Sequence, residues 1–190
     1  MSLSDSRPNA RLTVNYDASE RWYAGGSLSR AALIADRFNA QAIAYGGWVA
    51  RGGEGRHIEI GMSATGFADI SGYDFVEPYV GVLAERWSSR LYYAPNYYGR
   101  RVQTAYLEVD SHLPLEAQAR LFAHVGALVP LAGARGSADK RRFDIRVGAG
   151  IVVGSWDLHV AASAVTPGGP YPAVYTGRRS VLSAGAAFAF

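Results

Sequence analysis

The sequence predicts an all-β protein, an antiparallel transmembrane β-barrel of about eleven strands that occupies residues 1–190 as a single domain. Three observations predict it. Apolar and polar residues alternate along nearly the whole chain, and no helical periodicity persists beyond a turn or two. No window approaches the roughly 18 to 20 uninterrupted apolar residues of a membrane helix. The chain ends in small residues followed by Phe-Ala-Phe.

The last eight residues carry a specific pattern. In a strand, Phe188 and Phe190 point to one side, whereas Ser183, Gly185 and Ala187 point to the other. A polar residue, a glycine and two alternate aromatics at the end of the chain resemble the C-terminal assembly signal of bacterial outer-membrane barrels. Gly185, Phe188 and Phe190 are therefore the predicted signal, with the barrel-assembly machinery as partner. The alternative is an ordinary buried edge strand.

The strands follow one another with one apolar face each. The clearest is Arg142 to Gly154, which a two-residue turn at Gly154-Ser155 connects to a strand from Trp156 to Ala164. The segments 21–33 and 39–51 are strand-like, but their facing is ambiguous. The other expected outward sets, in chain order, are Leu12, Val14 and Tyr16; Ile58, Ile60 and Met62; Val76, Val80 and Val82; Trp87, Leu91 and Tyr93; Ala105, Leu107 and Val109; and Leu121, Ala123, Val125 and Ala127.

Connection lengths favour a membrane barrel over a soluble lipocalin-like barrel, which alternation alone does not distinguish. Short and long connections alternate, as they do between periplasmic turns and external loops. The short ones lie at 17–20, 52–55, 85–86, 114–117 and 154–155, and the long ones at 34–39, 66–73, 95–100, 132–140 and 166–177. This pattern predicts a location in the outer membrane of a Gram-negative bacterium.

The N-terminus suggests that a strand is missing. Single-chain bacterial barrels have an even number of strands, and such proteins need a signal peptide for export. Met1 to Pro8 reads as a loop, and no signal peptide precedes the strand at Arg11. We therefore expect that this chain lacks its signal peptide and its first strand, and that the intact protein has twelve strands.

A resemblance to a known family spans most of the chain. VEPYVGVLAERWSSRLYYAPNYYG from Val76, AYLEVDSHLPL from Ala105 and ARLFAHVG from Ala119 resemble the TorF-like porins. These are proteobacterial outer-membrane β-barrels of uncharacterised function. RLTVNYDASERWYAGG from Arg11 is similar to the family's second and third strands, whereas the Arg-containing strand that precedes them in the family is absent. The resemblance implies a barrel with pore function, and no substrate or catalytic residue.

The polar faces predict a lumen with both signs of charge. Ionisable side chains in an interior need water or a partner. One interpretation is a narrow aqueous pore for small polar or charged solutes; the alternative is a plugged interior in which Arg–carboxylate pairs cross-link strands. The predicted pore-lining residues are Arg86, Arg90, Arg120, Arg142, Arg146, Glu77, Glu108, Asp110, Asp144, His124 and His159, within a wider inward set that adds Arg11, His57, Glu59 and Asp157.

The outer face should contact lipid through Trp87, Tyr93, Phe143, Trp156 and Phe188. Nearly all of the positive charge is arginine, with Lys140 the only lysine, which either reflects genome composition or serves carboxylates inside and lipopolysaccharide phosphates outside. The Pro/Gly-rich segment Thr166 to Pro172 is expected to be a mobile surface loop; the alternative is a loop that folds into the mouth or binds a partner.

Other functions are less well supported. The chain has no cysteine, and no two histidines have close metal-ligand spacing. Glu108 and Asp110 share a face of one strand, but such a pair more often serves lumenal arginines than a metal, so we expect no metal and no cofactor. A lipid hydrolase is the main enzymatic alternative, yet no Gly-x-Ser-x-Gly elbow occurs, and we expect no enzyme. Arginine forms no dominant cluster, which argues against nucleic acid.

Overall fold

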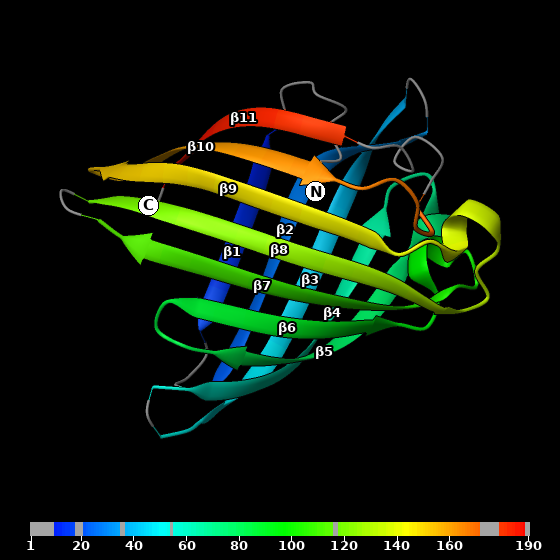
Figure 1. Cartoon of the computed structure of the whole chain (residues 1–190), viewed down its shortest axis with the longest axis horizontal. Coiled ribbons are helices and arrows are strands. Elements are labelled where there is room, and N and C mark those ends of the chain that lie inside the picture. The colour runs from blue at the N-terminus through cyan, green and yellow to red at the C-terminus, as the bar shows by residue number, and fades with distance from the viewer. Residues whose placement is uncertain are drawn as a thin grey trace.

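The computed structural model describes residues 10–17, 21–34, 37–53, 55–115, 118–171 and 179–188. Within these residues eleven strands form one sheet, and each strand pairs with its neighbours in chain order. The sheet curls into a barrel, with β1 to β4 forming the far wall in Figure 1 and β5 to β10 the near wall. The prediction of an all-β antiparallel barrel with eleven strands is confirmed. No helix in the described part of the chain is long and apolar enough to cross a membrane.

The element bounds follow the predicted alternation closely. Three short 3-10 helices, η1 (Ser71–Tyr73), η2 (Tyr97–Gly99) and η3 (Gly136–Asp139), lie in connections. The strands are β1 (Arg11–Asp17), β2 (Trp22–Ile34), β3 (Arg37–Arg51), β4 (His57–Phe67), β5 (Phe75–Leu83), β6 (Trp87–Ala94), β7 (Gln103–Pro114), β8 (Ala119–Ala132), β9 (Arg142–Val153), β10 (Trp156–Val165) and β11 (Arg179–Phe188).

The β9–β10 hairpin shows how local sequence sets the register. Gly154 has φ 60°, a left-handed conformation that two-residue hairpin turns require and that glycine adopts without strain. Val153 therefore pairs directly with Trp156, and the ladder continues from there. Trp156 in turn pairs with Phe188 on β11, with ring centroids 5.0 Å apart. The turn thus fixes which side chains of this hairpin face outward.

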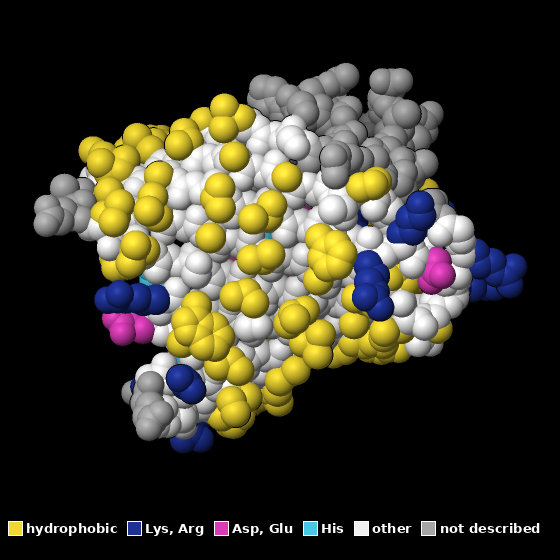
Figure 2. All heavy atoms as spheres, in the orientation of Figure 1, with side chains coloured by type: hydrophobic (Ala, Val, Ile, Leu, Met, Phe, Trp, Pro, Cys, Tyr) yellow, Lys and Arg dark blue, Asp and Glu magenta, His cyan; other side chains and the backbone are white. Residues whose placement is uncertain are grey.

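The outer surface of the strands is apolar. Figure 2 shows hydrophobic side chains spread over the wall of the barrel, with charged groups gathered towards its two ends in that view. Water would solvate such a surface poorly, whereas lipid would cover it. The exposed residues include Leu12, Val14, Tyr16, Ile58, Ile60, Met62, Val76, Val80, Trp87, Leu91, Tyr93, Leu107, Val109, Leu121, Val125, Phe143, Ile145, Val147, Trp156, Leu158, Val160 and Phe188.

The connections alternate in length, with one exception. The three 3-10 helices lie at one end of the barrel, on the right in Figure 1, and we call this the loop end. The expected long connection at 34–39 is wrong, because Ile34 already pairs with Arg37. The β2–β3 ladder continues past an irregularity between Ala31 and Ile34, so the two strands extend beyond the point where alternation fades.

Two edges of the sheet face each other without a described ladder between them. In the described residues β1 pairs with β2 and β11 pairs with β10, and no pairing joins β1 to β11. Strand direction alternates along an antiparallel sheet, so β1 and β11 run in the same direction. Gly185 and Phe188 of the predicted assembly signal lie in β11, whereas Phe190 and Met1 to Pro8 fall outside the described residues.

Candidate functional site

The interior of the barrel holds a cavity of about 1510 Å³ to which all eleven strands contribute side chains or backbone. Its lining carries four arginines, Arg11, Arg30, Arg90 and Arg146, and four carboxylates, Glu77, Glu108, Asp110 and Asp144. Inward-facing tyrosines and serines fill much of the remaining wall. The cavity is therefore polar, of mixed charge, and enclosed by a wall whose outer face is apolar.

The structure places most of the predicted lumenal residues around this cavity. Glu77, Arg90, Glu108, Asp110, His124, Asp144, Arg146 and His159 line it. The other three predicted residues lie elsewhere. Arg86 is exposed in the short β5–β6 turn, Arg142 is buried at the loop end, and Arg120 pairs with Asp157 at 2.7 Å.

One network joins β4 and β6 across the intervening strand. Glu59 is fully buried, and its carboxylate accepts a hydrogen bond of 2.5 Å from Nε of Arg90. The Tyr23 hydroxyl donates to the other carboxylate oxygen at 2.7 Å, and Tyr79 lies 2.6 Å from the same hydroxyl. Several donors thus satisfy a carboxylate that would otherwise be costly to bury. Sequence reasoning placed Glu59 inward but did not pair it with Arg90.

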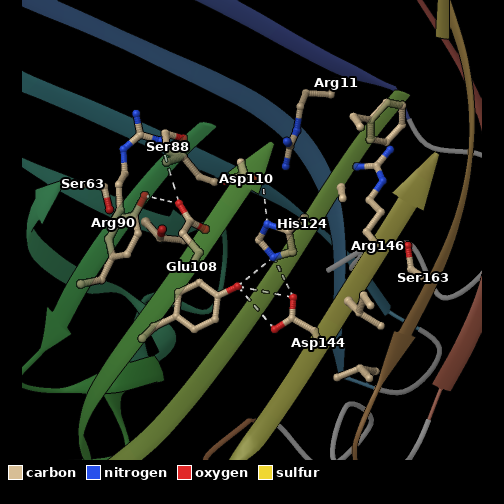
Figure 3. Close-up of a pocket in the computed structure, with 18 of the residues that line it drawn as sticks. Arg11, Ser63, Ser88, Arg90, Glu108, Asp110, His124, Asp144, Arg146 and Ser163 are labelled. Carbon is tan, nitrogen blue, oxygen red and sulfur yellow. Dashed lines mark hydrogen bonds and ion pairs between the residues drawn. The ribbon is translucent and has the colours of Figure 1, made fainter. Parts of the chain in front are cut away.

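A second network centres on His124. Nδ1 of His124 lies 2.8 Å from Asp110, and Nε2 lies 2.9 Å from Asp144. Figure 3 shows the imidazole held between these two carboxylates, with Glu108 beside Asp110. The Tyr106 hydroxyl lies 3.1 Å from Nε2, which adds a third contact to the ring. The arrangement fixes the ring and leaves carboxylate oxygens facing the cavity.

The register of the strands explains why these side chains meet. Asp110 pairs directly with His124 on β8, and Gly126 pairs with Asp144 on β9. A Cβ at Gly126 would lie 2.2 Å from the Tyr106 hydroxyl and 2.6 Å from Asp144. The absence of a side chain there is what lets both groups reach the imidazole. Spacing along the chain did not reveal this site, since its members come from three strands.

Two charged groups of the lining, Arg146 and Glu108, have weaker partners. The guanidinium of Arg146 lies 5.3 Å from the centre of the Phe122 ring, and its Nε has no hydrogen-bond partner among the described residues. Arg90 lies 3.9 Å from Glu108, whose own hydrogen bond of 2.9 Å comes from Tyr92. Arg146, Arg90 and Glu108 all line the cavity, so they remain accessible to its water and solutes.

An aromatic cluster occupies the loop end of the cavity. Tyr97 and Tyr98 of η2 and Tyr171 before β11 are buried together with Phe67 and other apolar residues. The Tyr97 and Tyr171 rings meet edge to face with centroids 5.6 Å apart. Burial raises the pKa of Tyr97 well above its ordinary value, so its hydroxyl stays neutral at physiological pH. All three tyrosines also line the cavity at this end.

The expectation of a mobile loop at Thr166 to Pro172 is wrong for its described part. Residues 168–171 are buried, and the Arg142 guanidinium donates 3.0 Å to the Gly168 carbonyl and stacks 4.4 Å from the Tyr171 ring. Arg100 donates 2.6 Å to the Tyr171 carbonyl. Two arginines outside the segment thus hold it against the mouth, a contact that loop composition does not predict. Pro172 lies outside the described residues.

These features together define a β-barrel of the outer-membrane type with a polar interior. Comparison with solved structures agrees. The fold is similar to a KdgM porin, with a TM-score of 0.65, 12% identity, and 96% of this chain and 92% of that chain covered. It is also similar to a NanC porin, with a TM-score of 0.72, 10% identity, and 96% and 93% covered. A KdgM porin in complex with disordered oligogalacturonate matches with a TM-score of 0.64, 13% identity, and 96% and 92% covered.

At these identities the comparisons show the fold. No protein-family model matches the chain. No curated protein matches it either.

Proposed function

We propose that this protein is an outer-membrane porin that gives small polar or charged solutes passive passage. The observation that carries the proposal is the cavity of about 1510 Å³, lined by charged and polar groups from strands whose outer faces are apolar. An apolar exterior suits lipid, and a hydrated interior of mixed charge suits small solutes. One similar structure, a KdgM porin, holds disordered oligogalacturonate.

The lining supports a pore that admits both signs of charge. Four arginines and four carboxylates line the cavity, and among them Arg90 lies 3.9 Å from Glu108. We therefore expect weak ion selectivity. We propose that Arg120 and Arg142 of the predicted pore-lining set stabilise the barrel wall. The members that contact the solute are Glu77, Arg90, Glu108, Asp110, His124, Asp144, Arg146 and His159.

The proposed partners follow from the outer surface. Outer-membrane lipids would cover the apolar face, and lipopolysaccharide phosphates would meet exposed arginines at the loop end. The barrel-assembly machinery would bind β11, which carries Gly185 and Phe188. Kinship with the TorF-like porins rests on the motifs of β5 to β8 and η2, and we propose neither a catalytic activity nor a nucleic-acid partner.

Single-channel recording in a planar bilayer tests the pore directly. Refolded protein should give discrete current steps, and Arg90→Gln or Arg146→Gln should change the cation-to-anion preference. Leu91→Ala, on the outward face of β6, is the matched control and should leave the preference unchanged. If heat-dependent gel mobility shows that the protein is folded but no current is recorded, a plugged structural or lipid-modifying barrel is favoured instead. The buried cluster of Tyr97, Tyr98 and Tyr171 is the observation that supports this second candidate.

A further inference from the structure

The wall formed by β7, β8 and β9 brings three carboxylates around one histidine, with Arg146 opposite that histidine on β9. Glu108, Asp110 and Asp144 surround one imidazole, that of His124. Arg90 makes its short contact, 2.5 Å, with Glu59 and lies 3.9 Å from Glu108. Glu77 adds a further carboxylate to the same cavity. A cation would be favoured here, because like charges on a partly desolvated wall repel one another.

The ligand atoms are close enough to share one ion. Glu108, Asp110 and His124 each offer an oxygen or nitrogen, and these atoms all lie within 4.8 Å of one another. Donors bound to one metal at about 2.0 to 2.2 Å lie roughly 3 to 3.5 Å apart, so small side-chain movements suffice. The three residues come from two paired strands, with Asp110 directly opposite His124. The β-ladder therefore holds the backbone of the site rigidly.

We propose that Glu108, Asp110 and His124 bind a divalent transition-metal cation in the barrel interior. Nδ1 of His124 and one carboxylate oxygen each of Glu108 and Asp110 would be the protein ligands, and the open side faces the cavity. A nitrogen donor beside two carboxylates suits Zn²⁺ or a similar ion better than Mg²⁺ or Ca²⁺, which prefer oxygen alone.

Asp144 fits the role of a positioning residue for this site. Its Oδ1 lies 2.9 Å from Nε2 of His124, on the opposite side of the ring from Asp110. A carboxylate that accepts the second ring N–H of a ligating histidine fixes the tautomer and leaves the other nitrogen free for the metal. Gly126 leaves the space in which Asp144 reaches the ring. The site therefore includes the support that metal-binding histidines usually have.

Isothermal titration calorimetry of refolded, tag-free protein in detergent with Zn²⁺ tests the proposal. It requires no measurement of current. We expect one Zn²⁺ per chain, with binding abolished by His124→Gln or Asp110→Asn. Asp144→Asn should weaken binding about 10- to 100-fold, as loss of the carboxylate that orients a metal-binding histidine usually does. Co²⁺ should give the visible absorption of a site with nitrogen and oxygen ligands, and that absorption should disappear in His124→Gln.

His57→Gln is the matched control, because it removes an imidazole at the start of β4 that lies outside the cluster. It should bind Zn²⁺ as the unaltered protein does. Gel mobility and circular dichroism establish that each variant is folded. If His124→Gln does not fold, Asp110→Asn carries the test, since Asp110 is half-exposed. Absence of Zn²⁺ binding at millimolar concentration, or binding that survives Asp110→Asn, would overturn the site and leave the pore proposal untouched.

Discussion

Glu59 and Arg90 lie on strands that are not neighbours, and their side chains meet across Gly81 with Nε 2.5 Å from Oε1. Glu59 pairs with Gly81 on β5, and Gly81 pairs with Arg90 on β6. Because Gly81 has no side chain, the Glu59 carboxylate and the Arg90 guanidinium can meet over the strand that lies between them. Glu59, Gly81 and Arg90 thus form a row across three strands. The ion pair of the buried Glu59 carboxylate cross-links β4 to β6 on the inner face of the barrel.

Loss of the Glu59 charge should destabilise the barrel. Glu59→Gln leaves the Arg90 guanidinium without its closest carboxylate, and we expect a loss of about 1–3 kcal/mol in the free energy of unfolding in detergent. Denaturant unfolding followed by tryptophan fluorescence measures this. Arg120→Gln is the comparison, because its partner Asp157 is more exposed, and it should cost about 1 kcal/mol or less. Equal losses in the two variants would contradict the proposed weight of the buried pair.

Gly81 should be intolerant of any side chain. A Cβ there would lie 2.6 Å from Oε1 of Glu59 and 2.8 Å from the Ser89 carbonyl, so the backbone or the ion pair must move. We expect Gly81→Ala to cost about 1–3 kcal/mol through overpacking. Gly53→Ala, in an exposed turn with no atom within 4 Å of the added Cβ, should be close to neutral. Thermal unfolding of both variants checks the contrast, and an unaffected Gly81→Ala would refute it.

The aromatic cluster should limit the current. Tyr171→Ala removes a ring that packs against Tyr97 and Arg142, at a packing cost of about 3 kcal/mol. The mouth should widen, and the unit conductance in a planar bilayer should rise. Tyr93→Ala on the outward face of β6 is the control and should leave conductance unchanged. An unaltered conductance in folded Tyr171→Ala would place the narrowest point elsewhere.

The end of the chain should matter for assembly more than for conduction. Phe188 packs against Trp156 on the outer face, and Phe190 continues the same period in the sequence. Phe190→Ala and Phe188→Ala should both lower the amount of protein in outer membranes, while the protein that does assemble should conduct normally. Leu158→Ala, outward on β10, is the control for a lost apolar side chain. Normal surface levels of Phe190→Ala would count against the signal.

We also predict that one further strand lies between β1 and β11. Both strands run in the same direction, so a single strand between them closes an antiparallel barrel with an even count. Their backbones would then be about 9.5 Å apart, beyond the about 7 Å that a disulfide spans. Cysteines at Val14 and Leu182 should therefore not cross-link in outer membranes. Cysteines at Leu12 and Leu28, which pair across β1 and β2, should do so.

A rapid disulfide between β1 and β11, at Leu182 with any of Leu12, Val14 or Tyr16, would contradict this prediction. It would mean that eleven strands close directly, with one parallel pair. Cross-linking of β1 to β11, compared with cross-linking of β1 to β2, thus tests how the barrel closes. Leu182 is 83% exposed, more than any other large hydrophobic of the described residues, as an uncovered edge would be.

The fold class and the facing of most strands were predictable because each strand carries its own signal. A side-chain period of two and a two-residue turn at Gly154-Ser155 depend only on nearby residues. The outward residues Phe143, Ile145 and Val147 are each about half exposed, as the alternation indicated. Where the alternation fades, after Ala31, the prediction of a loop was wrong because pairing with β3 extends the strand.

By itself, the sequence determined the antiparallel barrel, its apolar outer face and the charged character of its interior, since these follow from local alternation and composition. Only the tertiary structure decided which charges meet. Arg90 contacts Glu59 and His124 contacts Asp110 and Asp144 because of the register between strands and because Gly81 and Gly126 leave room. Contacts between residues 14 to 38 positions apart depend on how strands are aligned, and alternation along one strand carries no information about that alignment.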